Sequence, residues 1–248
     1  MIRMNKQKAF GLVEFMLGLF LGTCLLTLMI RHYLTIKQLS LDTAHVLAEA
    51  YDQQLISELI QTSIRQAGFT PCAPIRWLTT HEVKPLHSLQ AIVLNAGEKK
   101  ALQISRMSEN FSIIQEIISK KQVVLGADLS FKMHASVLIA DCFHAEIKTI
   151  ESIQRKGLDW HVRFNTPLHH TYTPPIYIGE WLQERFFIDK NNQGEDALYY
   201  QLKHAEELSS QIKGLSVKLE TRGVKQLIAI DFLLSQEKTW HLETTVRV

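Results

Sequence analysis

The 248-residue chain has little net charge and lacks the motifs of several common protein classes. Its formal net charge is +2, and no basic run exceeds two or three residues, so it has no charge pattern typical of nucleic-acid binding. It contains no G-x-S-x-G nucleophile motif, no phosphate-binding P-loop and no paired-carboxylate pattern. We therefore expect neither a nucleic-acid partner nor an enzyme.

Metal-binding patterns are missing as well, although the chain has 11 histidines. No H-x-x-x-H or C-x-x-C spacing occurs after the first apolar run. The adjacent His169 and His170 would point to opposite faces of an extended strand. The carboxylate of Asp141, directly before Cys142, disfavours a reactive thiolate. We expect no metal and no cofactor, with histidines in loops or at the surface.

Proline is absent from the first 70 residues, and nothing there interrupts a long helix. Residues 10–30 are apolar apart from one acid, and these 21 residues would span roughly 32 Å as a helix, enough to cross a bilayer. Apolar residues then recur at helical spacing through residues 34–67. Gly68 and Pro71 are typical of a helix end. The sequence predicts one helix from about residue 10 to 67.

Glu14 is the one carboxylate in the apolar run. An isolated charge inside a membrane costs several kcal/mol, and such residues are usually paired. Glu14 could lie near the headgroups. Alternatively, cleavage before Phe10 would create a cationic amine one helical turn from Glu14, which could pair with it in the same chain or in a neighbouring copy. Basic residues flank the run, at Arg3, Lys6 and Lys8 before it and at Arg31 after it.

This N-terminal pattern resembles the signal of type IV pilins and pseudopilins. The shared features are a short basic leader, a small residue (Ala9), and Phe10 followed by Glu14 at the start of an apolar helix. The resemblance implies that a prepilin peptidase cuts between Ala9 and Phe10, that the new amine is methylated, and that Glu14 directs assembly. Ala9 replaces the family's usual glycine, and Gly11 its usual serine or threonine.

Beyond Pro71 the sequence indicates short strands separated by turn residues. Residues 112–119 fit either a strand or a short helix, residues 206–212 indicate a helical turn, and residues 169–175 indicate a loop because of two prolines. The expected fold class is α+β, with the long helix packed on an antiparallel sheet. The strands are expected at 90–94, 101–106, 122–125, 136–140, 145–150, 160–164, 185–188, 198–203, 214–220, 225–233 and 239–247.

Three cysteines are present. Cys24 lies in the apolar run, where a thiol acts as a small apolar side chain. Cys72 and Cys142 lie in the later part and could form either a disulfide or two reduced, buried thiols.

Three later stretches resemble the PilW-type minor pilins, relatives of the J-type minor pseudopilins of type II secretion. These stretches are Ile64–Cys72, with Ile-Arg-x-Ala-Gly-aromatic-x-x-Cys; Val137–Cys142, a strand ending in Asp-Cys; and Glu207–Val217, which leads into a late strand. The resemblance implies that Cys72 and Cys142 are disulfide partners.

The resemblance also implies a structural subunit of a type IV pilus tip or initiation complex, with other minor and major pilins as partners. Residues 1–9 would form a cytoplasmic leader, 10–30 the transmembrane half of the helix in the inner membrane, 31–68 its amphipathic half, and 69–248 a periplasmic domain. Two alternatives stay open. One is a J-type pseudopilin of type II secretion, and the other is a single-pass anchored periplasmic binding protein or enzyme.

Overall fold

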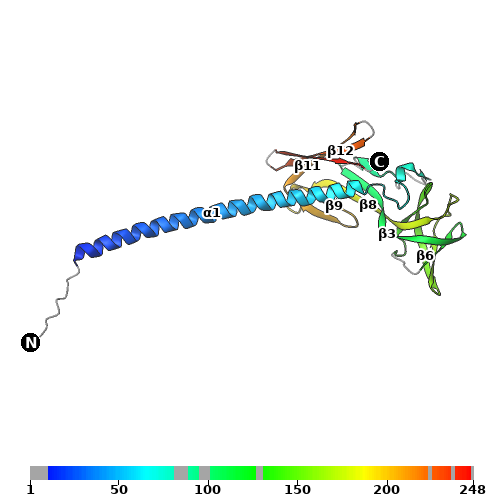
Figure 1. The fold of residues 1–248 in the computed structure, drawn as a ribbon, viewed down its shortest axis with the longest axis horizontal. Coiled ribbons are helices and arrows are strands. Elements are labelled where there is room, and N and C mark those ends of the chain that lie inside the picture. Colours follow the sequence, from blue (N-terminus) through cyan, green and yellow to red (C-terminus); the bar gives the residue numbers. More distant parts are fainter. Residues whose placement is uncertain are drawn as a thin grey trace, which may run out of the picture. The chain divides into compact units, whose positions relative to one another are not determined.

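The structure is a computed structural model that describes residues 11–80, 89–94, 101–126, 131–222, 225–235 and 238–246. The chain divides into two compact units, residues 1–55 and residues 56–248. Figure 1 shows the single long helix and the strands of the second unit. The fold is α+β, as the sequence predicts.

Helix α1 extends from Leu12 to Arg65. The turn that follows it contains Gly68, which has a φ of +66° that glycine adopts without strain. A side chain at this position would also approach the Cβ of Ala91 to 2.8 Å. The predicted end signal is therefore correct, because glycine is required here by both backbone conformation and space.

Burial along α1 begins later than the apolar spacing predicts. Apolar spacing through residues 34–67 favours an apolar face that packs on the sheet, but the apolar residues from Leu34 to Leu55 are exposed, for example Leu47 at 69%. Ile56, Ile60 and Ile64, one turn apart, are buried and belong to the core of the second unit. The core-forming part of the helix is therefore its last three turns.

The strands of the second unit form two sheets that are antiparallel throughout, except where β1 pairs with β6 in parallel. The larger sheet has ten strands in the order β10-β9-β8-β5-β6-β7-β4-β3-β2, with β1 off this path and β3 also pairing with β8. Its strands are β1 (Thr79–Thr80), β2 (Ile92–Leu94), β3 (Ala101–Ser119), β4 (Gln122–Leu125), β5 (Ser136–Ala140), β6 (His144–Lys156), β7 (Asp159–Phe164), β8 (Ile176–Lys190), β9 (Asp196–Gln201) and β10 (Ala205–Ser209).

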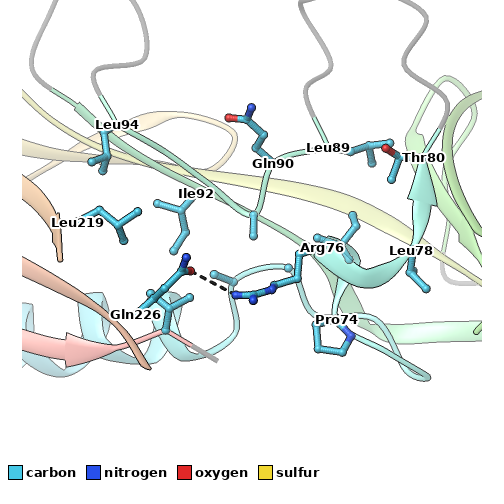
Figure 2. A pocket seen from close by; sticks show the side chains of 15 residues that line it. Pro74, Arg76, Leu78, Thr80, Leu89, Gln90, Ile92, Leu94, Leu219 and Gln226 are labelled. Carbon is cyan, nitrogen blue, oxygen red and sulfur yellow. Dashed lines mark hydrogen bonds between the residues drawn. The ribbon is translucent and has the colours of Figure 1, made fainter. Parts of the chain in front are cut away.

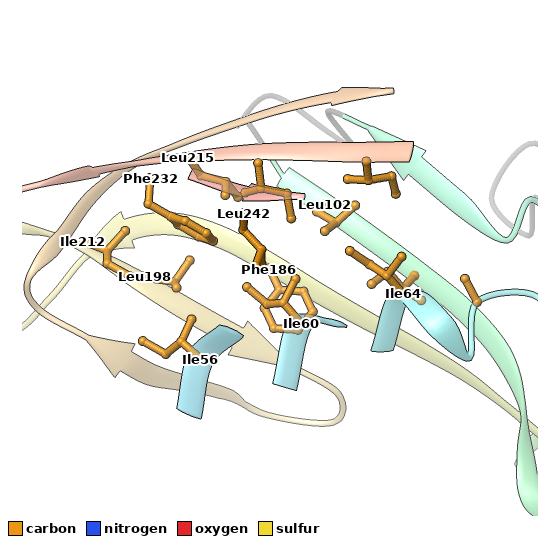
Figure 3. Close-up of a cluster of buried hydrophobic side chains, with 14 of the residues drawn as sticks. Ile56, Ile60, Ile64, Leu102, Phe186, Leu198, Ile212, Leu215, Phe232 and Leu242 are labelled. Carbon is orange, nitrogen blue, oxygen red and sulfur yellow. The ribbon is translucent and has the colours of Figure 1, made fainter. Parts of the chain in front are cut away.

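The smaller sheet is a three-stranded meander of β11 (Ile212–Arg222), β12 (Lys225–Leu234) and β13 (Thr239–Thr245). Its apolar side chains join those of the larger sheet and the end of α1 in one core (Figure 3). Phe232 of β12, Phe186 of β8 and Ile60 of α1 are all fully buried in this cluster. The end of the helix is therefore enclosed by residues from both sheets.

Two local predictions are settled by strand pairing. Residues 112–119, which fitted either helix or strand, form the end of β3 and pair with β4 and β8. The helical turn predicted at residues 206–212 is wrong, because residues 205–209 form β10 and pair with β9. The Glu-Glu-Leu segment favours a helix locally, but the edge of the sheet supplies hydrogen bonds that outweigh this preference.

Candidate functional site

The first part of α1 carries a continuous apolar surface. From Leu12 to Ile30 its large apolar side chains are all more than half exposed. Its two threonines satisfy their hydroxyl groups within the helix, since Thr23 donates to the Phe20 carbonyl and Thr27 to the Thr23 carbonyl, both at 2.8 Å. Among the described residues, α1 is the one helix long and apolar enough to cross a membrane.

Glu14 lies in the first turn of α1 and caps it. Gly11 directly precedes the helix, and its backbone amide donates to Oε2 of Glu14 at 3.3 Å. The amide of Glu14 in turn donates to the Gly11 carbonyl at 3.0 Å. This is the backward half of a capping box, in which an acid at the third helical position binds an amide that the helix leaves unpaired. The carboxylate is therefore turned back toward the N-terminal end of the chain.

The predicted cleavage site, Ala9 and Phe10, lies outside the described residues, as does the basic leader at Arg3, Lys6 and Lys8. Of the predicted assembly residues, the structure describes Glu14 alone.

Cys72 and Cys142 form a disulfide, with their Cα atoms 5.1 Å apart. The bond joins the segment that follows α1 to the turn between β5 and β6. Cys24 is a free thiol on the exposed surface of α1. Of the two arrangements that the cysteines allowed, the disulfide is confirmed.

Asp141 organises the turn that contains Cys142. Its buried carboxylate accepts backbone amides from Phe143 at 2.8 Å and His144 at 2.6 Å, and from Thr173 at 2.8 Å. Burial alone would raise the pKa of Asp141, but these amide hydrogen bonds outweigh it and hold the pKa below its usual value. The residue before the cysteine therefore fixes the turn rather than activating a thiol.

A second buried carboxylate lies on β6. Glu146 and Lys148 are 1% and 2% exposed, and Nζ of Lys148 lies 2.8 Å from Oε2 of Glu146. Glu146 also accepts from the amide of His169 at 3.1 Å and from the Tyr172 hydroxyl at 2.7 Å. Lys148 donates to the Pro167 carbonyl at 2.6 Å. Both charged side chains of β6, Glu146 and Lys148, thus hydrogen-bond to the loop between β7 and β8.

These contacts shift the pKa values of Glu146 and Tyr172. Burial raises the pKa of Glu146, whereas the hydrogen bonds from Lys148, Tyr172 and His169 lower it, and the net shift is downward. Burial and the neighbouring Glu146 carboxylate raise the pKa of Tyr172 above its usual range. Glu146 is therefore ionised and Tyr172 neutral at neutral pH. In these states Glu146 accepts the hydrogen bonds that attach the loop between β7 and β8 to strand β6.

The end of α1 has an ionic anchor of its own. Ser63 donates a short hydrogen bond to Oε2 of Glu184 on β8. The other carboxylate oxygen binds Arg106 on β3, with Nη2 at 2.9 Å. Glu184 is 2% exposed, and it therefore ties the helix to two strands inside the core.

Sequence reasoning named Glu14, Cys72 and Cys142 and missed the buried pair of Glu146 and Lys148. One signal was present: residues two apart in a strand share a face, so a predicted strand at 145–150 places both charges on one side. Among the described residues, no group of three or more His, Cys, Asp or Glu side chains has the geometry to hold a metal ion.

Fold and site together define an α+β protein with an N-terminal apolar helix able to span a membrane and a disulfide-closed β domain. Compared with protein-family models, with curated proteins and with solved structures, the chain matches none of them.

Proposed function

We propose that the chain is a minor pilin of the PilW type, a structural subunit that promotes assembly of a type IV pilus. It acts by packing its apolar helix against the helices of other pilins, and its partners are the prepilin peptidase and other minor and major pilins. Before assembly it resides in the inner membrane, with the N-terminus in the cytoplasm and the β domain in the periplasm.

The observation that carries this proposal is the direction of the Glu14 carboxylate. It binds the amide of Gly11, the residue directly after Phe10. If a peptidase cuts before Phe10, the new amine belongs to the residue directly before Gly11, and we propose that it pairs with the same carboxylate. The pair would offset part of the cost that an isolated charge carries inside a membrane.

Two further features support the proposal. The exposed apolar side chains from Leu12 to Ile30 suit a helix that moves from lipid to the apolar core of a filament, since both surroundings are free of water. The disulfide between Cys72 and Cys142 suits an oxidising compartment such as the periplasm.

The first test is mass spectrometry of the protein extracted from membranes. A mature chain that starts at a methylated Phe10 is the expected result, and an intact Met1 would contradict processing. Ala9→Gly restores the residue usual in the family and should raise the processed fraction.

The second test is incorporation into sheared pili. Glu14→Ala should leave the protein in the membrane, with its disulfide formed, but reduce its amount in pili at least tenfold. Glu58→Ala removes an exposed carboxylate later on the same helix and is the matched control. Normal incorporation of the Glu14 variant would refute the assembly role. A defect in protein secretion without a change in pili would place the chain in a type II secretion system instead.

A further inference from the structure

A largely apolar pocket of about 380 Å³ lies between the end of α1, strand β2 and the smaller sheet (Figure 2). This volume is within the range of pockets that bind ligands in proteins. Its apolar lining includes buried Ile75, Leu78 and Leu89, and half-buried Ile92 and Leu94. Leu219 at its border is 49% exposed, so the pocket opens to solvent.

Among the described residues that line the pocket, Arg76 is the one cation. Arg76 extends across the pocket toward Gln226, and Nη1 of Arg76 lies 3.3 Å from Oε1 of Gln226 (Figure 2). In the part of the chain that the structure describes, no carboxylate forms an ion pair with Arg76. A guanidinium group held by a neutral amide can still bind a carboxylate with two parallel hydrogen bonds.

Strand β2 forms one wall of the pocket and is an edge strand of the larger sheet. On the side of β3, the Ser105 amide donates to the Ala91 carbonyl at 2.8 Å, and Ile92 and Leu94 lie opposite Ile104 and Leu102. Because hydrogen-bonded and non-hydrogen-bonded pairs alternate in an antiparallel ladder, the amides and carbonyls of Ile92 and Leu94 face away from β3. No strand among the described residues pairs with this outer edge.

We propose that this pocket binds the C-terminal end of an extended partner polypeptide. The peptide would add a strand along the outer edge of β2, place aliphatic side chains in the pocket, and bind its terminal carboxylate to Arg76. The three features together favour this occupant: an edge strand supplies main-chain hydrogen bonds, an apolar pocket selects side chains, and a guanidinium group selects a free carboxylate. The proposal is independent of the proposed function, because it uses neither the apolar helix nor Glu14.

The test measures binding of fluorescent peptides to the full chain in nanodiscs, so that detergent does not occupy the pocket. The probes are hexapeptides of alternating threonine and valine that end in valine, with either a free carboxylate or a C-terminal amide. The acid should bind at least tenfold more tightly than the amide. Arg76→Gln should remove this preference, and Arg76→Lys should retain part of it. Arg163→Gln, which alters an exposed arginine on β7, is the matched control and should bind both peptides as the wild type does.

Two further arms test the edge strand and the pocket. Methylating peptide nitrogens at alternate positions should abolish binding in one register and spare it in the other, because one set of amides faces β2. Leu219→Trp should weaken binding of both peptides by obstructing the pocket. Equal binding of acid and amide, or an Arg76→Gln variant that keeps the preference, would overturn the proposal. Displacement by dodecanoate combined with indifference to N-methylation would assign the pocket to a fatty acid and also overturn it.

Discussion

Removal of the disulfide is the perturbation whose magnitude the structure defines best. Cys72 and Cys142 are 70 residues apart in sequence, and their bond closes a loop that contains β1 to β5. In the chain-entropy description, a loop of this length stabilises the folded state by about 4 kcal/mol. Replacing both cysteines with serine should lower the free energy of unfolding of the second unit by that amount.

The measurement is urea unfolding of the full chain in nanodiscs, followed by tryptophan fluorescence. Trp181 is 6% exposed and lies in the β domain, so its emission reports unfolding of that unit. With an m-value of about 2 to 3 kcal/mol per molar urea, the midpoint should fall by roughly 1 to 2 M. Wild-type protein treated with a reductant should have the same urea midpoint as the double variant. Cys24→Ser, which alters the free cysteine, should leave the midpoint unchanged.

A loss below about 1 kcal/mol would refute this reasoning, since the unfolded chain would then gain little freedom when the bond is absent. A midpoint that falls in the double variant but not in the reduced wild type would also contradict it, because the serine side chains rather than the lost crosslink would then be the cause.

Three further predictions concern charge and packing. Lys148→Met removes the cation beside the buried carboxylate of Glu146, which keeps only its hydrogen bonds from His169 and Tyr172, and should lower the free energy of unfolding by about 3 to 5 kcal/mol in urea titrations. The folded-state pKa values of Asp141 and Glu146 lie below their usual values. Their stabilising contribution is therefore present above about pH 4 and is lost as the pH falls through the folded-state values. Acid unfolding followed by circular dichroism measures this loss. Ile60→Ala removes a fully buried side chain and should cost about 2 to 5 kcal/mol in the same urea titrations.

The matched controls lie at exposed positions. Lys203→Met breaks an exposed pair with Glu180 and should change stability by less than about 1 kcal/mol. Leu47→Ala shortens an exposed side chain on α1 and should have little effect on unfolding of the second unit. If the buried and exposed variants lost equal stability, burial would not be the deciding variable.

His241 gives a pH dependence of opposite sign. It lies between Asp231 and Glu243, at 2.6 and 3.2 Å, and hydrogen bonds to these carboxylates raise its pKa. Its stabilising contribution is complete below the usual histidine pKa of about 6.5 and is lost as pH rises through the higher folded value. Titration of the ring protons by NMR should show this raised value, and Asp231→Asn should bring it back toward the usual range.

The long helix could be predicted from sequence because its signals are local. Apolar spacing, the absence of proline and a terminal glycine act within a few residues of one another, and the observed bounds of α1 differ from the predicted ones by about two residues. Which part of the helix is buried could not be predicted in this way. Leu47 and Ile60 occupy similar sequence patterns, and only the packing of the second unit distinguishes them.

The lengths of the longest strands were underestimated for a related reason, whereas the bounds of β4 and β5 were predicted correctly. The prediction gave 185–188 for a strand that extends from Ile176 to Lys190, because its length depends on pairing with β3, β5 and β9. The buried pair of Glu146 and Lys148 depends likewise on a loop that is distant in sequence. By contrast, the link between Cys72 and Cys142 was predicted through a family resemblance and not from local chemistry.

The disulfide also has a mechanical consequence. Once tension between α1 and the C-terminal strands has pulled the end of the helix out of the core, the load passes from Cys72 through the covalent bond to Cys142. The segment between them is then bypassed, so roughly 240 Å of potential extension cannot be drawn out while the bond is intact. A reduced domain could lengthen under force by that additional amount. In the oxidised domain, the disulfide keeps the load off the segment that contains β1 to β5.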